Sequence, residues 1–166
     1  MVDRRFALAA VCLVFVAAPV VATEEAAASA TPLALALSDT ALQWGPCPDF
    51  APKGCAIAVL HGNPAERNSD IFFRLPPGSE IANHRHTSAE RMVLVSGELD
   101  VAYEGKPVIS LKRGMYAWGP AQLAHSARCT SSEPCVLFIA FEEPLDAIPV
   151  APAAPASSEA TAVASH

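Results

Sequence analysis

Residues 78–97 read GSEIANHRHTSAERMVLVSG, and this stretch decides the fold. It places His84, His86 and Glu90 within seven residues, between two glycines. Because side chains alternate between the two faces of an extended strand, His84 and His86 are expected to point to the same side. Two neutral imidazoles and a nearby carboxylate suit a borderline divalent cation. The stretch therefore predicts a metal site built on β-strands.

The spacing of these residues resembles the first motif of the cupin family, G-x5-H-x-H-x3-E-x6-G, and matches it at every fixed position. The second cupin motif, G-x5-P-x-G-x2-H-x3-N, is met downstream by Gly114, Pro120 and His125. The sequence departs from it at Gln122, where the motif has glycine, and at Cys129, where it has asparagine. These two positions mainly shape the turn, so the departures leave the ligand positions intact.

The resemblance covers residues 40–145 and implies an all-β fold, a single small antiparallel β-barrel of the cupin type, also called a double-stranded β-helix or jelly roll. It also implies four metal ligands: His84, His86, Glu90 and His125. Nitrogen and oxygen ligands are compatible with Fe, Mn, Zn, Ni and Cu, so the sequence does not choose the divalent ion. The alternative is a barrel that keeps these residues without holding a metal in practice.

Short β-rich runs recur along the middle of the chain and agree with this fold class. Turns containing Gly or Pro separate them, and no convincing helical period is visible. The nine predicted strands are 55–60, 70–75, 81–86, 91–95, 98–103, 108–111, 116–118, 123–129 and 135–141. Alternation predicts that Met92 and Leu94 share the inward face with Glu90. The continuously apolar run 136–141 is expected to be buried on both sides.

The N-terminal segment reads as an export signal. Two arginines precede an apolar run over residues 6–21, and small residues end at Ala22, which predicts a secretory signal peptide over 1–22. The alternative is a retained membrane anchor, although the run is short for a span of about 20 residues. The rest of the chain is expected to divide into a flexible lead, the cupin domain and a disordered Ala- and Pro-rich tail, over residues 23–39, 40–147 and 148–166.

Export places the protein in the periplasm or outside the cell. The mature chain keeps 9 Lys and Arg against 16 Asp and Glu, a net charge of −7. Without a basic cluster, nucleic-acid binding is not expected, and neither is stable membrane insertion after signal cleavage. The expected partners are a small-molecule ligand and, by resemblance to cupins, a second copy of the chain in a homodimer.

Four cysteines remain after signal cleavage, in a compartment where disulfides persist. They allow three pairings. The local pairs Cys47–Cys55 and Cys129–Cys135 are favoured, because a turn between two strands brings the second pair to opposed positions close to bridging distance. The alternative is that the thiols are buried or free.

Two functions fit these features. One is a metal-dependent oxidoreductase of the dioxygenase type, and the other is a non-catalytic cupin that binds or senses a metal or small molecule. The opening Trp44-Gly-Pro and the later Val59-Leu-His-Gly also resemble small exported bacterial cupins. A weaker resemblance is to the sensory domain of zinc-binding anti-sigma factors.

A second catalytic group is expected if the protein is an enzyme. The candidates, each with a structural role as the more frequent alternative, are Tyr103, Tyr116, Arg74 and Gln122. Trp118 and Met115 are candidates for an apolar wall beside a small ligand, with core packing as the alternative.

Overall fold

The structure is a computed structural model that describes residues 32–151. The predicted signal peptide, residues 23–31 of the predicted lead and residues 152–166 of the predicted tail lie outside the described residues. Between residues 32 and 151 the chain forms eleven β-strands and no α-helix. Accordingly, this part of the chain has no helix with the length and apolar character needed to cross a membrane.

All nine predicted strands are present, and their observed ends differ from the predicted ones by at most two residues. Two short strands at the ends of the domain, β1 and β11, were not predicted. The strands are β1 (Trp44–Pro46), β2 (Ala56–His61), β3 (Ser69–Leu75), β4 (Glu80–Arg85), β5 (Glu90–Ser96), β6 (Glu98–Tyr103), β7 (Ile109–Lys112), β8 (Tyr116–Gly119), β9 (His125–Cys129), β10 (Cys135–Phe141) and β11 (Ile148–Pro149).

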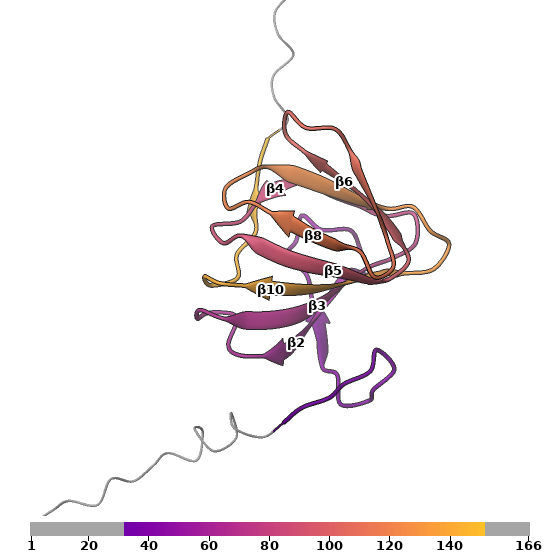
Figure 1. Cartoon of the computed structure of the whole chain (residues 1–166), viewed down its shortest axis with the longest axis vertical. Coiled ribbons are helices and arrows are strands. Elements are labelled where there is room, and N and C mark those ends of the chain that lie inside the picture. The colour runs from indigo at the N-terminus through magenta and orange to yellow at the C-terminus, as the bar shows by residue number, and fades with distance from the viewer. Residues whose placement is uncertain (1–31, 152–166) are drawn as a thin grey trace, which may run out of the picture. The chain divides into compact units, whose positions relative to one another are not determined.

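The strands form two antiparallel sheets in a jelly-roll arrangement, as the sequence predicted. One sheet has the order β1-β2-β3-β10-β5-β8, and the other has the order β11-β4-β9-β6-β7. Figure 1 shows most of the first sheet, with β8, β5, β10, β3 and β2 stacked in that order. From β3 onward the chain passes from one sheet to the other at every connection except the β6–β7 hairpin. These crossings bring residues that are distant in sequence together between the sheets.

The inward faces of both sheets supply the core. Along β5, Met92 and Leu94 are 3% and 0% exposed, whereas Arg91 between Glu90 and Met92 is exposed. The predicted alternation is therefore confirmed, and Glu90 lies on the inward face with 4% exposure.

The outward face of β10 is also largely covered, as expected for its continuously apolar sequence. Val136 and Phe138 pack there in a second apolar cluster, which includes Leu35, Leu37 and Leu42. Leu35 and Leu37 belong to the segment predicted to be a flexible lead. They pack here because apolar side chains on the outer face of a central strand need a cover.

The two local cysteine pairs lie at disulfide distance, with Cα–Cα separations of 5.7 Å for Cys47–Cys55 and 5.6 Å for Cys129–Cys135. The second pair explains one departure from the cupin motif, because Cys129 stands at the asparagine position and is fully buried. Gly97 is required beside it. Its φ is +82°, and a Cβ there would lie 2.8 Å from the Cys135 sulfur.

Candidate metal centre

Three strands from both sheets carry the predicted ligands. His84 on β4 and His125 on β9 are direct partners in the antiparallel register, and their ring centroids lie 4.4 Å apart. His86 follows the end of β4, and Glu90 begins β5 in the opposite sheet. All four side chains are buried, so the structure brings together the four residues that the motifs predicted.

The distances between these side chains fit a shared ion. The candidate nitrogen atoms of the three histidines all lie within 4.8 Å of one another. Glu90 places Oε1 at 3.3 Å from His86 Nε2 and Oε2 at 3.3 Å from His125 Nε2. Two ligand atoms that each sit about 2.1 Å from one ion are roughly 3.0–3.4 Å apart. His86 Nε2 is buried without a hydrogen-bond partner, which is what a nitrogen reserved for a metal requires.

Backbone carbonyls fix the orientation of all three imidazoles. In His84 and His125, Nδ1 donates to the carbonyl oxygen two residues earlier, at 2.8 Å and 3.1 Å. In His86, Nδ1 donates to the carbonyl oxygen of Asp146, which lies 60 residues away in sequence. Because each Nδ1 carries the proton, each Nε2 keeps its lone pair for the site.

A segment after β10 holds the His86 turn in place. We call residues 142–147 the strap. The Asp146 carboxylate accepts hydrogen bonds from the backbone N and the hydroxyl of Thr87, at 2.9 Å and 2.8 Å. At the other end of the strap, the buried Ser88 hydroxyl accepts hydrogen bonds from the backbone N of Glu142 and of Glu143. The strap is therefore tied at both ends to the turn between two ligands.

Sequence reasoning missed Asp146 and Ser88. Neither residue belongs to a spacing pattern, and Asp146 acts on His86 mainly through its backbone carbonyl, which any residue type could supply. The only signal is the short polar turn that follows β10, and such turns are common.

Burial sets the protonation of the metal-free site. It lowers the pKa of His84 and of His125 to about 4, and it also lowers the pKa of His86. Burial likewise raises the pKa of Glu90 to about 8. The imidazoles are therefore neutral at pH 7 and ready to act as ligands. The raised pKa keeps the Glu90 carboxyl mostly protonated at pH 7 in the absence of metal, and a bound cation would stabilise its ionised form as a ligand.

An apolar cavity of about 60 Å³ adjoins the four ligand residues. A single water needs roughly 10–15 Å³ measured in this way, so the cavity has room for several non-hydrogen atoms. Its other lining residues are Pro48, Ile57, Ile71, Phe73, Ile81, Met92, Leu99, Val101, Ala127, Leu137, Ile139, Phe141, Leu145, Asp146 and Ala147. The strap residues among them are half-buried and form part of the rim.

Tyr103 lies beside the site on the partner strand of His125, with its ring centroid 5.2 Å from that imidazole. Its hydroxyl is buried and makes no hydrogen bond within the described structure. Burial, together with the charge of Glu90, raises the Tyr103 pKa. A Cβ at Gly119 would lie 2.9 Å from this hydroxyl and 3.1 Å from Glu90 Oε2. The hydroxyl and the carboxylate therefore converge on the space that Gly119 leaves open.

Arg74 and Gln122, two of the other predicted catalytic candidates, lie away from the cavity. Arg74 stacks over the Trp44 ring, 4.1 Å from its centroid. Gln122 is exposed, with a φ of +65°, and its backbone N donates to the His86 carbonyl at 2.8 Å. It thus adopts the left-handed conformation that glycine would provide at this motif position.

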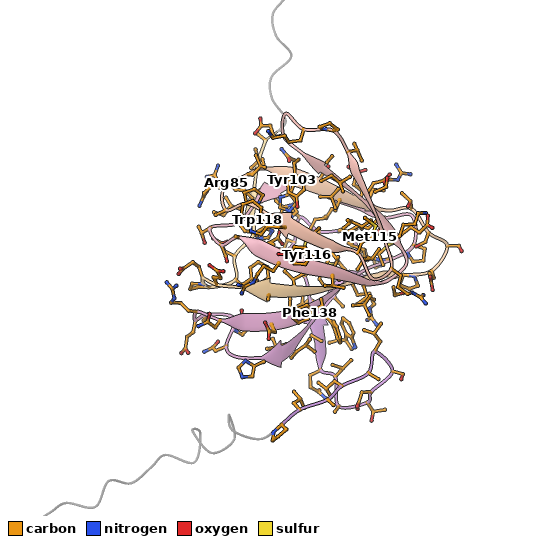
Figure 2. The ribbon with its side chains drawn as sticks, in the orientation of Figure 1. Arg85, Tyr103, Met115, Tyr116, Trp118 and Phe138 are labelled. Atoms are coloured by element: carbon orange, nitrogen blue, oxygen red, sulfur yellow. A yellow bond between two sulfur atoms is a disulfide. The ribbon has the colours of Figure 1, made fainter. Side chains whose placement is uncertain are left out.

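The remaining candidates gather on the surface. Tyr116 is 60% exposed, Trp118 58% and Met115 42%, along β8 and the turn before it (Figure 2). They line a second hollow that does not include the ligand residues. Core packing is therefore wrong for Trp118 and Met115, because β8 is an edge strand of the described sheet and leaves these side chains exposed. An apolar wall beside a small ligand stays a prediction, now for this second hollow.

Comparison with known proteins agrees with the geometry. A family model described as the cupin domain matches residues 71–141, which include all four ligand residues. A search of curated proteins found no match.

Solved structures with the same fold include enzymes. The DMSP lyase DddQ from Ruegeria pomeroyi is 20% identical with a TM-score of 0.58, over 69% of this chain and 64% of that chain. A variant of oxalate decarboxylase from Bacillus subtilis is 17% identical with a TM-score of 0.55, over 66% of this chain and 30% of that chain. A structure of the same decarboxylase, described by its Mn(II) centres, is 17% identical with a TM-score of 0.52, over 59% of this chain and 29% of that chain.

At these identities the likeness concerns the fold. This chain spans less than two thirds of the lyase and under a third of the decarboxylase. The likeness to the cupin domain covers residues 71–141, less than half of the chain, and the two facing antiparallel sheets and the fold of these neighbours agree with it.

Proposed function

We propose that this protein is an exported cupin that holds one divalent ion on His84, His86, Glu90 and His125, and that it acts as a dioxygenase-like oxidoreductase on a small organic substrate. One observation carries the proposal. Three imidazoles with free Nε2 atoms and one buried carboxylate meet between the sheets beside an apolar cavity. Without a cation the buried Glu90 carboxyl keeps its proton because burial disfavours the charged form, whereas a divalent ion would compensate the charge of the ionised carboxylate.

A bound divalent ion supplies Lewis acidity and open positions for a substrate oxygen. The residues of the chain have other tasks. The backbone carbonyls orient the imidazoles, the apolar wall excludes water, and the strap covers one side of the cavity. Among the cupins of similar fold, oxalate decarboxylase has Mn(II) centres, which supports manganese as one of the candidate ions.

The alternative is a non-catalytic cupin that binds or senses a metal or small molecule. A specific observation favours it. Apart from the four candidate ligands, Asp146 is the only titratable side chain among residues 32–151 that lines the cavity, and its two carboxylate oxygens both accept hydrogen bonds from Thr87. Unless one of the candidate ligands takes part, the cavity wall formed by the described part of the chain therefore offers no free general acid or base.

Export to the periplasm or the cell exterior belongs to this proposal. The predicted signal peptide over residues 1–22 supports it. The two cysteine pairs at disulfide distance add support, because such bridges persist in oxidising compartments.

The metal proposal is tested on protein purified from the periplasm of an expression host. Elemental analysis should find about one divalent ion per chain. Calorimetric titration of the chelator-treated protein should show that Glu90→Gln and His86→Ala each bind the ion at least tenfold more weakly. His61→Ala is the matched control, since His61 is exposed and outside the site. Periplasmic protein that is cation-free, and that takes up none of the five candidate ions, would overturn the proposal.

The same protein separates the two functions. Oxygen uptake is measured with a panel of small diols and thiols. Turnover that His86→Ala abolishes supports the oxidoreductase. Tight binding of a panel member without turnover supports the binding or sensing protein.

A further inference from the structure

We propose that the cavity selects a molecule with an uncharged apolar body that meets the ion through a group carrying a single negative charge, such as an enolate, phenolate or thiolate, and that it discriminates against dianions such as dicarboxylates. The inference rests on the proposed function in one respect: a divalent ion occupies the site of the four ligand residues. The discrimination itself comes from the wall and the rim of the cavity.

The cavity wall is built almost entirely from hydrocarbon. Apart from the ligand residues and Asp146, every lining residue is apolar, and no Lys or Arg from residues 32–151 reaches the cavity. Ile71, Leu137 and Ile139 are each at most 4% exposed, so this part of the wall is shielded from solvent. A ligand charge that the ion does not neutralise would therefore lie in surroundings without a partner, which is strongly unfavourable.

The cationic side chains closest in sequence to the ligands face away from the cavity. Arg85 lies between two ligand histidines and is exposed, at the surface in Figure 2. Arg91 follows Glu90, but strand alternation turns it outward, and it pairs with Glu142 at 2.7 Å. Neither residue can compensate a second negative charge on a ligand without leaving its place in the sheet.

The rim adds repulsion rather than compensation. Asp146 is half-buried there, and its two carboxylate oxygens are hydrogen-bonded to Thr87. Its negative charge is thereby held at the entrance. Leu145 and Ala147 flank it and offer only apolar surface.

The charges at the centre set the preferred ligand. A divalent ion with one carboxylate and three neutral imidazoles carries a net charge of +1. One singly charged donor group brings the site to neutrality, whereas a dianion leaves one negative charge uncompensated in the apolar cavity. The remainder of the ligand is then apolar, because it contacts residues such as Met92 and Leu137.

Acetylacetone and malonate form a suitable probe pair, because both present two oxygens on a three-carbon frame. The first binds as a monoanion with methyl ends, and the second is a dianion. Zinc content is measured first on the zinc-loaded protein, and each probe is then titrated calorimetrically at pH 7. Acetylacetone should bind with a Kd at least tenfold lower than that of malonate.

Variants at the rim test whether the absence of a cationic side chain from the cavity causes the preference for acetylacetone over malonate. Leu145→Arg should strengthen malonate binding at least fivefold, whereas Leu145→Gln, similar in size and uncharged, should not. Ile57→Arg with Ile57→Gln repeats the test on β2, should the strap not tolerate the change. Malonate that binds wild-type protein as tightly as acetylacetone, or arginine variants that do not gain malonate affinity, would overturn this inference. A protein that takes up neither zinc nor any of the other four candidate ions would instead refute the proposed function, before any probe is added.

Discussion

At Gly119, the absence of a side chain leaves room for two polar groups of the candidate metal centre. Tyr103 comes from β6 and Glu90 from β5, in opposite sheets, and both reach the space beside this residue of β8. A Cβ at 2.9 Å and 3.1 Å from their oxygens is closer than side-chain atoms normally approach. The glycine therefore allows a hydroxyl and a ligand carboxylate to approach one another from two sheets.

Gly119→Ala should weaken zinc binding about tenfold and lower the free energy of unfolding by about 1–3 kcal/mol, the usual cost of overpacking. The added methyl group must displace the Tyr103 hydroxyl or the Glu90 carboxylate. Calorimetry and urea denaturation measure the two effects. Gly45→Ala is the control, because its nearest neighbour, a backbone oxygen, would lie 3.8 Å from the added carbon. Unchanged zinc affinity in Gly119→Ala would show that the site tolerates the crowding.

Among the connections between strands, the strap supports the candidate metal centre, since it joins the end of β10 to the turn between β4 and β5. Its carbonyl at Asp146 orients His86, and its carboxylate holds Thr87. Beyond it, β11 pairs with β4, two residues past the predicted end of the domain at 147. The chain therefore continues in ordered pairing along the strand that carries His84, because β4 would otherwise leave an open edge.

Asp146→Ala should reduce zinc affinity by about 10- to 100-fold, the usual effect of losing a group that orients a ligand. The change removes both hydrogen bonds to Thr87 and leaves the Asp146 carbonyl less firmly placed against His86. Calorimetric titration of zinc measures it. Glu143→Ala, which removes an exposed ion pair with Arg67 from the same strap, should stay within about 0.5 kcal/mol of wild type in stability and bind zinc normally. Equal affinities in the two variants would rule out this role for Asp146.

Removal of the two disulfides should have different effects on the candidate metal centre. Replacing either pair by alanines should lower the free energy of unfolding by about 2 kcal/mol, since each closes a loop of fewer than ten residues. Only the loss of Cys47–Cys55 should also weaken binding at the centre. Its loop carries Pro48, which lines the cavity, and Phe50, whose ring lies 5.5 Å from that of His84. Denaturation and calorimetry on both double variants test this, and equal binding in the two would contradict it.

At the scale of the whole molecule, the crossings between the sheets create the site. β4 and β9 are neighbours in one sheet and β5 lies in the other, so the ligands converge only after both sheets have formed. The site therefore forms only when the complete fold has formed, and its buried titratable groups affect the stability of the whole domain.

The metal-free protein should be most stable near pH 6.5. Burial lowers the pKa values of His84 and His125 to about 4, so below pH 6.5 the unfolded state binds protons that the folded state does not bind. The free energy of unfolding therefore falls on acidification. The pKa of Glu90, raised to about 8, means that the folded state keeps a proton that the unfolded state loses above pH 4.5. The effect of Glu90 opposes that of the histidines and is the larger one above pH 6.5. The free energy of unfolding should decline there by at most about 1.4 kcal/mol per pH unit up to pH 8.

Urea denaturation at pH 5, 6.5 and 8, with chelator and with zinc, measures this dependence. Zinc should abolish the decline above pH 6.5, because it binds the ionised carboxylate, and Glu90→Gln should abolish it without metal. Metal-free wild-type protein whose stability rises steadily from pH 6.5 to 8 would show that Glu90 is ionised in the folded state.

Local pattern was sufficient for most of the strands. Alternation along β5 predicted that Met92 and Leu94 face inward, and the two cupin motifs predicted which histidines and which glutamate would meet. The pairing of Cys129 with Cys135 could also be inferred, because a short turn determines it. The strand faces and the cysteine pair depend on a period of two or on residues close in sequence, whereas the meeting of His125 with the other three residues was inferred from the resemblance to the cupin motifs.

Other features depended on what lies across a sheet or at its edge. The surface position of Trp118, the stacking of Arg74 on Trp44 and the support of His86 by Asp146 are set by contacts between distant segments. A single sequence does not reveal which strand is left at an edge or which loop returns over a site. By itself, the sequence determined the strand pattern and which four candidate ligands would meet, because alternation along each strand sets the first and the resemblance to the two cupin motifs indicated the second. Only the tertiary structure decided the wall, the rim and the support of the centre, because packing between the sheets creates them.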